Sequence, residues 1–376
     1  MRLAALSAVL LCCALAVSAY AQSPEYALER EEAARLQQAA DALSDGRGVD
    51  AQALVERQLR GESALDINEA ARRIAGAARE GMLARRALFV RLIAITLLAA
   101  LLCRFQEAFG EGAANAAQWI CFLNAALLVA QESAGVFATV QRTVSGAAEG
   151  AQTLFPVLTT ALAAVGGTGS AAALQPAVTF AVTAATVVCR RICLPLTAAF
   201  LTFSLLGCMT DGWPLSRMSA LCRTLCGAAL GVGLTAFTGL MTVRGFTAAV
   251  KDGMTLRAAK FAADTLIPEV GGALSDTAES ALAGALLVKN ALGVTGMVLI
   301  GLFFLTPLTE ICLSALLFRA AAAVTEPFAD VRMTRCLEAA GGAMGMLAGC
   351  LTGVMAMFLV LAGQAVAAGG VIAMML

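Results

Sequence analysis

Residues 261–293 have the sequence FAADTLIPEVGGALSDTAESALAGALLVKNALG, a long stretch with many polar residues inside an otherwise apolar body. Pro268 removes a backbone donor and fixes φ, and Gly271 and Gly272 follow it with conformational freedom that other residues lack. This combination predicts a break between two helices. In a membrane protein, a break of this kind is tolerated where protein or a water-filled cavity covers the backbone.

The second helix of this stretch has clear start signals. Ser275 and Asp276 are both good N-caps, and Glu279 lies at capping-box distance from either of them. We therefore expect the helix to begin at Ser275 or Asp276 and to run to Lys289 and Asn290. Several charged side chains then lie close to apolar surface.

The composition places the whole chain in the membrane class. Of its 376 residues 60% are hydrophobic and 14% are charged, against about 25% charged in typical soluble domains. Mean hydropathy is +0.81. The chain has zero net charge, which suggests no nucleic-acid partner. It has no histidine, no Walker-type nucleotide loop and no Gly-x-Ser-x-Gly sequence, so we expect neither an enzyme nor a metal or cofactor site.

The first 21 residues have the pattern of a secretory signal peptide. Arg2 precedes an apolar run at 3–17, and Ala19-Tyr20-Ala21 matches a cleavage site. An uncleaved signal anchor is the alternative. The apolar run is short for a span, which needs about 20 residues, and this favours cleavage.

Residues 22–86 differ from the rest of the chain in their high charge, with 12 acidic and 10 basic residues. Helical pieces are expected at 29–43, 51–59 and 65–84. Apolar residues are few, so the region fits a small helical domain, a stalk that orders on a partner, or a solvated helical linker.

The orientation signals disagree. A signal peptide would place residues 22–86 outside the cytoplasm. The arginines that precede the first span, together with Glu107 and Glu111 after it, favour the cytoplasm by the positive-inside rule. We follow the signal peptide and expect an extracytoplasmic region, because translocated domains can override the rule.

Residues 87–376 are predicted to form an all-α, multi-pass membrane domain of about seven to eight spans, some of them short or broken. Glu132 is expected near the end of a span, because a carboxylate at mid-membrane is costly. The spacing Gly227-x-x-x-Gly231 and the glycines of the last span predict close helix packing. The expected spans are 87–105, 116–140, 153–165, 174–188, 192–209, 220–243, 291–319 and 339–368.

The segment 243–293 is expected to combine an amphipathic helix with the helix pair that Pro268 interrupts. Its first part, 244–264, is basic and has an apolar stripe, which suits either the membrane interface or packing on the bundle. Beyond it, Pro307 predicts either a kinked helix or two pieces. Glu310 is then either a functional carboxylate within a span or a loop residue.

Two segments, Cys189-Arg-Arg-Ile-Cys193 and Cys222-Arg-Thr-Leu-Cys226, each place two thiols one helical turn apart. A four-thiolate metal site is conceivable. Neighbouring arginines favour the thiolate form without any metal. Paralogous helices, or a weak internal repeat with a 33-residue offset, explain the likeness of the two segments equally well. The placement of the 12 cysteines also argues against a disulfide framework, because most of them lie in or beside apolar runs, where cysteine behaves as a small hydrophobe.

The run ADTLIPEVGGALSDTAES, followed by LLVKNALG, resembles the signature region of the stage III sporulation protein AE family, and the likeness extends over nearly the whole chain. The resemblance implies a membrane component of the channel that links mother cell and forespore, required for late forespore development. It places the protein in the mother-cell membrane around the forespore, with residues 22–86 between the two membranes. The implied partners are the other stage III A-group proteins and the forespore protein Q.

Two further hypotheses come from the residues alone. Broken helices and charges within the apolar body suit a secondary transporter with a site near the membrane centre. A non-conducting structural anchor is the other alternative. The candidate pathway and motif residues are Asp264, Pro268, Gly271, Gly272, Ser275, Asp276, Lys289, Asn290 and Glu310.

Overall fold

The computed structural model describes residues 37, 51–60, 67–104, 111–164, 168–209, 215–266, 271–327 and 330–375. Its elements are α3 (Ala51–Leu59), α4 (Ile67–Arg104), α6 (Glu111–Ala164), α7 (Thr168–Thr186), η1 (Val187–Cys193), α8 (Leu194–Met209), α9 (Ser216–Leu266), α10 (Gly271–Thr325) and α11 (Val331–Met375). All regular secondary structure in the described residues is helical, which confirms the all-α class. The proposed signal peptide lies outside the described residues.

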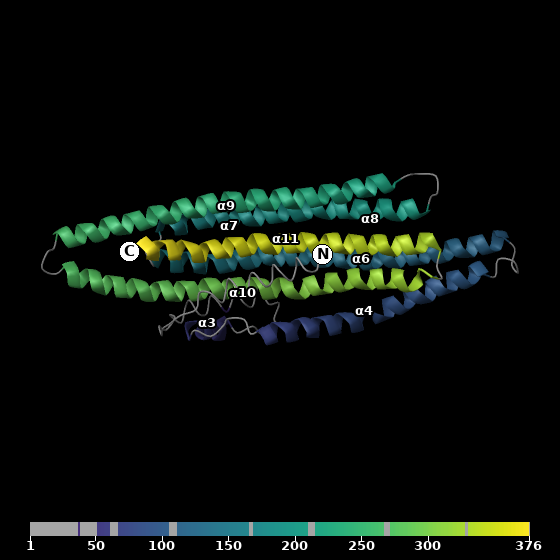
Figure 1. Ribbon diagram of the computed structural model, residues 1–376, viewed down its shortest axis with the longest axis horizontal. Helices are drawn as coiled ribbons and strands as arrows, with labels where there is room; N and C mark the ends of the chain where they lie inside the picture. The colour runs from purple at the N-terminus through teal and green to yellow at the C-terminus, as the bar shows by residue number, and fades with distance from the viewer. Residues whose placement is uncertain are drawn as a thin grey trace.

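The long helices form an elongated antiparallel bundle, in which successive rods run in opposite directions (Figure 1). Helices α7, η1 and α8 follow one another as a single rod. Helix α11 lies between α9 and α10, packs most extensively on α10, and also touches α6, α7 and α8. The core therefore surrounds α11, where Leu347, Leu351 and Val354 are fully buried.

These helices are longer than the expected spans. Helix α10 has 55 residues, so it is about 82 Å long at 1.5 Å per residue, against about 30 Å for the hydrocarbon core. Some segments that were expected to be separate helices are joined. Residues 116–140 and 153–164 both lie in α6, and 220–243 and 244–264 both lie in α9. Within the described residues five helices are long and apolar enough to cross a membrane, and the count of seven to eight spans stays a prediction.

Two expected break points differ from the structure. Helix α10 begins at Gly271, about one turn before the expected start at Ser275 or Asp276. It also continues through Pro307, so the expected division into two pieces is wrong, while the alternative of a kinked helix stays a prediction. A proline removes one backbone hydrogen bond. Here Phe304 and Leu308 on either side are buried against neighbours, and this packing holds the helix together.

The junction between α7 and α8 is a π-helix and not the interhelical break expected between 174–188 and 192–209. The wider turn of η1 keeps Cys189 and Cys193 fully buried while Arg190 and Arg191 remain exposed. π-Helical turns are rare and often occur at functional sites.

The N-terminal region continues into the bundle. Helix α3 matches the expected piece at 51–59, and it packs on α10 with Val55 fully buried. Helix α4 runs without interruption across residue 86, where the sequence suggested a boundary between the charged region and the membrane domain.

Glycine packing follows the prediction at some positions of α11 but not at the Gly227-x-x-x-Gly231 spacing of α9. A Cβ at Gly341 would lie 3.3 Å from the carbonyl oxygen of Ala315, and one at Gly353 would lie 3.1 Å from Leu230. By contrast, Gly227 and Gly231 face open space, so the expected packing role of their spacing is wrong. The spacing alone does not say which face of a helix meets a neighbour.

Candidate functional site

The structure separates the residues that the sequence grouped as a pathway. Asp276 and Glu310 are 34 positions apart on the continuous helix α10, which corresponds to about 51 Å along its axis. They therefore cannot form one compact site within a single chain. The glycine pair at the start of α10 lies at one end of the bundle, where α9 ends and α10 begins (Figure 1).

The predicted residues near this end are only partly described. The backbone of Asp264 belongs to α9, and the backbones of Gly271, Gly272, Ser275, Asp276 and Lys289 belong to α10. Their side-chain surroundings and the whole of Pro268 lie outside the described part of the structure. Their role in a pathway stays a prediction.

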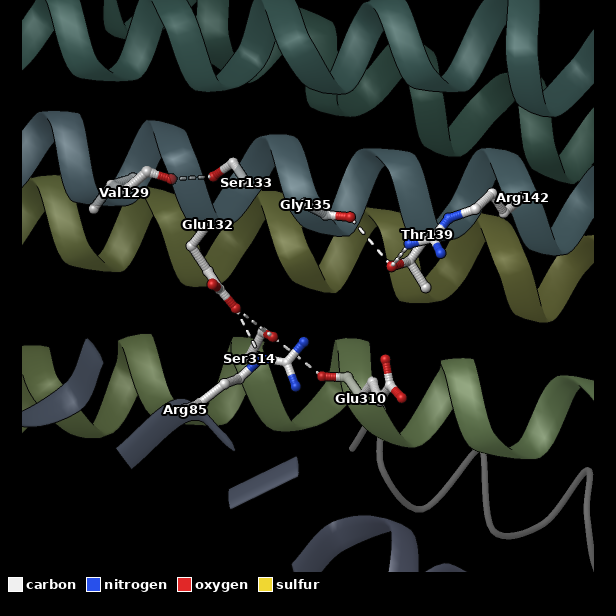
Figure 2. Close-up of polar contacts among 9 residues, drawn as sticks. All are labelled: Arg85, Val129, Glu132, Ser133, Gly135, Thr139, Arg142, Glu310 and Ser314. Atoms are coloured by element: carbon white, nitrogen blue, oxygen red, sulfur yellow. Dashed lines mark hydrogen bonds and ion pairs between the residues drawn. The ribbon is translucent and has the colours of Figure 1, made fainter. Parts of the chain in front are cut away.

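A polar cluster that the sequence did not single out lies inside the bundle (Figure 2). The Nε of Arg85 on α4 donates to Oε1 of Glu132 on α6 at 2.7 Å. The hydroxyl of Ser314 on α10 lies 3.5 Å from the same carboxylate oxygen and donates to the backbone carbonyl of Glu310 at 3.1 Å. Three helices therefore meet at one ion pair, which we call the Arg85–Glu132–Ser314 cluster.

The local sequence explains why Glu132 faces its neighbours. Val129 and Val136, one turn before and after it, are 0% and 2% exposed, so Glu132 lies beside the buried stripe of α6. The adjacent Ser133 is also buried and donates to the carbonyl of Val129 at 2.6 Å. The serine hydroxyl is thus satisfied within its own helix, and the carboxylate remains available for another helix.

Gly81 lets α4 approach α10 without displacing Leu313. A Cβ at Gly81 would lie 2.9 Å from a methyl carbon of Leu313, so only a residue without a side chain allows this contact without a shift. Gly81 and Arg85 are one helical turn apart and lie on the same side of α4. The close approach at Gly81 therefore brings the guanidinium of Arg85 within reach of Glu132 and Ser314.

The ion pair is shielded from solvent but not fully buried, with side chains 19% and 20% exposed. Partial desolvation strengthens the attraction between the charges and also makes the loss of either partner costly. The cluster fixes the register of α4 against α6 and α10. It is a charged contact within a largely apolar bundle, and charges in such places commonly have functional roles in membrane proteins.

Glu310 lies beside the cluster without joining the ion pair. Its side chain is half-buried, and its carboxylate points away from Glu132 (Figure 2). It belongs to the apolar segment Asn290–Thr325, a candidate membrane span. Among the predicted pathway residues, only the side chains of Asn290 and Glu310 are described, and Glu310 is the ionisable one of the two. It lies within a candidate span.

Asn290 is the other predicted residue with a described side chain. Its Oδ1 is buried and, in the part of the chain that the structure describes, has no hydrogen-bond partner. The same holds for Oγ1 of the nearby Thr295. Both residues lie on the stretch of α10 where Leu54 of α3 packs against Val294. Unpaired buried acceptors carry a desolvation cost, so this stretch of α10 is less stably packed than its apolar surroundings suggest.

The sequence offered weak signals for the cluster. Glu132 lies within the continuous helix α6, and its expected place near the end of a span stays a prediction. Arg85 was counted only among the charges of the N-terminal region, and Ser314 carries no motif. Arg85 and Glu132 are 47 positions apart in the sequence, and Glu132 and Ser314 are 182 positions apart. Local sequence patterns therefore do not predict their contact.

Comparison with known proteins agrees with the resemblance that the sequence signature indicated. The family profile of stage III sporulation protein AE matches residues 49–369. The chain is 28% identical over 264 residues to "Stage III sporulation protein AE" of Bacillus subtilis (strain 168). That match covers 68% of this chain and 65% of the relative, so it leaves about a third of the relative unmatched. No solved structure matches the chain.

The family match extends over most of the described helices, from α3 to near the end of α11, and includes the residues of the Arg85–Glu132–Ser314 cluster. It also contains the stretch at 261–293 on which the resemblance rested. The chain therefore belongs to the stage III sporulation protein AE family.

Proposed function

We propose that this protein is a membrane component of the complex that connects the mother cell with the forespore, and that it is required for late forespore development. Membership of the stage III sporulation protein AE family is the observation that carries the proposal. The five apolar helices of spanning length in the described part of the bundle support a membrane location. The protein supplies architecture or a path for solutes to this complex, and catalysis is left to other subunits.

The proposed location is the mother-cell membrane that surrounds the forespore. The other stage III A-group membrane proteins and the forespore protein Q are the proposed partners. Helix α3 and the first part of α4 carry charged residues and pack along the bundle, so they offer a polar surface next to the apolar spans. In the proposed orientation this surface faces the space between the two membranes.

The direct test is removal of the gene from its native host. Sporulation is expected to stop after engulfment, with loss of a late forespore reporter and of heat-resistant spores, while vegetative growth continues. A copy of the intact gene restores both readouts. Normal reporter activity and normal spore yield in the deletion strain would refute the proposal.

A conduit through the bundle is favoured over a passive anchor by one observation, the half-buried carboxylate of Glu310 within an apolar segment of α10. A charge in such a place is retained at a cost, which suggests contact with water or solute. We expect Glu310→Gln to lower late forespore expression without lowering the amount of protein. The matched control is Glu326→Gln, because Glu326 is exposed at the end of the same helix.

Thiol labelling separates conduit from anchor. In a chain without its native cysteines, single cysteines at Ala51, Asp276 and Glu310 are exposed to a membrane-impermeant thiol reagent. Labelling of all three positions indicates water along the bundle, as a conduit or a secondary transporter requires. Labelling at Ala51 alone indicates a packed anchor and contradicts the proposed path through this chain.

A further inference from the structure

Four buried thiols meet in the bundle core where the π-helix faces α9 and α11. Cys189 and Cys193 from η1 and Cys350 from α11 are 0% exposed, and Cys226 from α9 is 2% exposed. The sequence suggested the pairs at 189/193 and 222/226. In the structure Cys350, which lies far away in sequence, takes part in this cluster.

The contacts within this group are short. The Sγ atoms of Cys350 and Cys189 lie 3.2 Å apart. Cys193 lies close to Cys226 and Cys350, and the Sγ of Cys226 lies 3.9 Å from the hydroxyl of Thr197. Apart from the Thr197 hydroxyl, the sulfur atoms of this group mainly face one another in the described part of the chain.

The geometry favours a bond between two sulfurs over a shared metal ion. Two thiolates on a tetrahedral zinc, each about 2.3 Å from the metal, lie about 3.8 Å from each other. The pair at 189 and 350 is closer than that, and no group of three or more Cys, His, Asp or Glu among the described residues could hold a metal ion. A disulfide requires an S–S distance of about 2.05 Å, which small side-chain rotations can reach from this starting contact.

We propose that Cys189 and Cys350 are a modification site, a dithiol that a lipid-soluble quinone oxidises to a disulfide joining η1 to α11. In this step the Sγ–Sγ bond forms and two S–H bonds break. The two electrons and two protons pass to the quinone, which becomes the hydroquinone. Both thiols are 0% exposed, so an oxidant reaches them when the helices separate locally, and an uncharged, lipid-soluble quinone enters such an apolar opening more readily than a charged reagent does.

The position of the bridge on the π-helix indicates how it would affect the structure. Its wide turn places Cys189 and Cys193 on the buried side, and a π-turn is a local departure from the more stable α-helix. A covalent bond to α11, around which the bundle packs, would hold η1 in place. The oxidised and reduced proteins would then differ in how freely the α7–η1–α8 rod moves against α11.

The test uses a chain that keeps only Cys189 and Cys350, with the other ten cysteines replaced by alanine and a protease site inserted between Met209 and Ser216. Membranes are treated with tetramethylbenzoquinone, whose ring carbons are fully substituted and cannot add thiols. After cleavage, a gel without reductant is expected to show the two fragments still joined. Reductant should separate them.

The matched control keeps Cys189 with Cys336 in place of Cys350. Cys336 is also 0% exposed on α11, but it lies 14 positions away, about 21 Å along the helix. We expect the joined fraction to be at least about tenfold lower for this control, because the thiols cannot approach within bonding distance. Equal joining in the two chains would show non-specific oxidation and overturn the proposal.

A second control shows whether the quinone treatment can form a disulfide between helices of this bundle at all. A cysteine pair introduced by Val188→Cys and Gly233→Cys should join under the same treatment, because a Cβ at Gly233 lies 3.3 Å from a side-chain carbon of Val188. If this pair is joined and the 189/350 pair is not, the proposed bridge is wrong. Joining in the native chain that persists after Cys350→Ala would assign the bridge to another pair, and would also overturn it.

Discussion

Replacing Glu132 with alanine is expected to lower the free energy of unfolding by about 2–3 kcal/mol, less than the 3–5 kcal/mol for a fully buried pair, because the side chains are one-fifth exposed. The change leaves the guanidinium of Arg85 without its carboxylate between α4 and α6. The effect is measured by heating the purified protein in detergent and recording how much of its monodisperse gel-filtration peak is lost at each temperature.

Two further variants separate the loss of the pair from a general effect of mutation. Glu56→Ala removes a surface partner of Arg60, in a pair of 3.8 Å whose side chains are 71% and 68% exposed, and should change stability by less than about 1 kcal/mol. The double variant Arg85→Leu/Glu132→Leu should recover most of the loss, because apolar replacements of a shielded pair are often neutral. A Glu132→Ala effect as small as that of Glu56→Ala would contradict a stabilising cluster.

Substituting leucine for Gly293 is expected to prevent normal packing of α10 against α11. A Cβ at this position would overlap with a methyl carbon of Val366 on α11. Overpacking of this kind typically costs about 1–3 kcal/mol, and the rest of the leucine side chain has no space to occupy. The amount of folded protein in membranes and its thermal stability should both fall.

Helix α10 supplies the matched control for this prediction. Gly301 lies two turns further along, and a Cβ there would meet nothing within 4 Å, so Gly301→Leu should be tolerated. Adding Val366→Ala to Gly293→Leu should restore part of the lost stability, because it removes the methyl groups that clash. If the two glycine variants behave alike, the close approach of α10 and α11 at this level is wrong.

The main features of class and family were accessible from the sequence. The apolar composition predicted an all-α membrane protein, and the piece at 51–59 was identified with its correct bounds. Pro268 and the glycines after it correctly separated two helices, since α9 ends at Leu266 and α10 begins at Gly271. These features depend on local backbone chemistry, which adjacent residues determine.

Helix lengths were harder to predict, because local signals were overridden by packing. Pro307 and the arginines at 190 and 191 each suggested an interruption, yet both positions lie inside continuous rods. Buried neighbours on both sides offset a lost hydrogen bond at Pro307, and a π-turn accommodates the arginine pair while their buried neighbours keep their contacts. Such compensation comes from other helices and leaves no mark in the local sequence.

The amino-acid sequence thus determined the membrane class, the family and the turn between α9 and α10. Only the tertiary structure decided that Arg85, Glu132 and Ser314 form one cluster, and that Cys350 is the neighbour of Cys189. Helical periodicity identifies which residues share a face, but not which face of another helix they meet or at what height. That register is determined by close contacts such as the one at Gly81, where a missing side chain lets α4 approach α10.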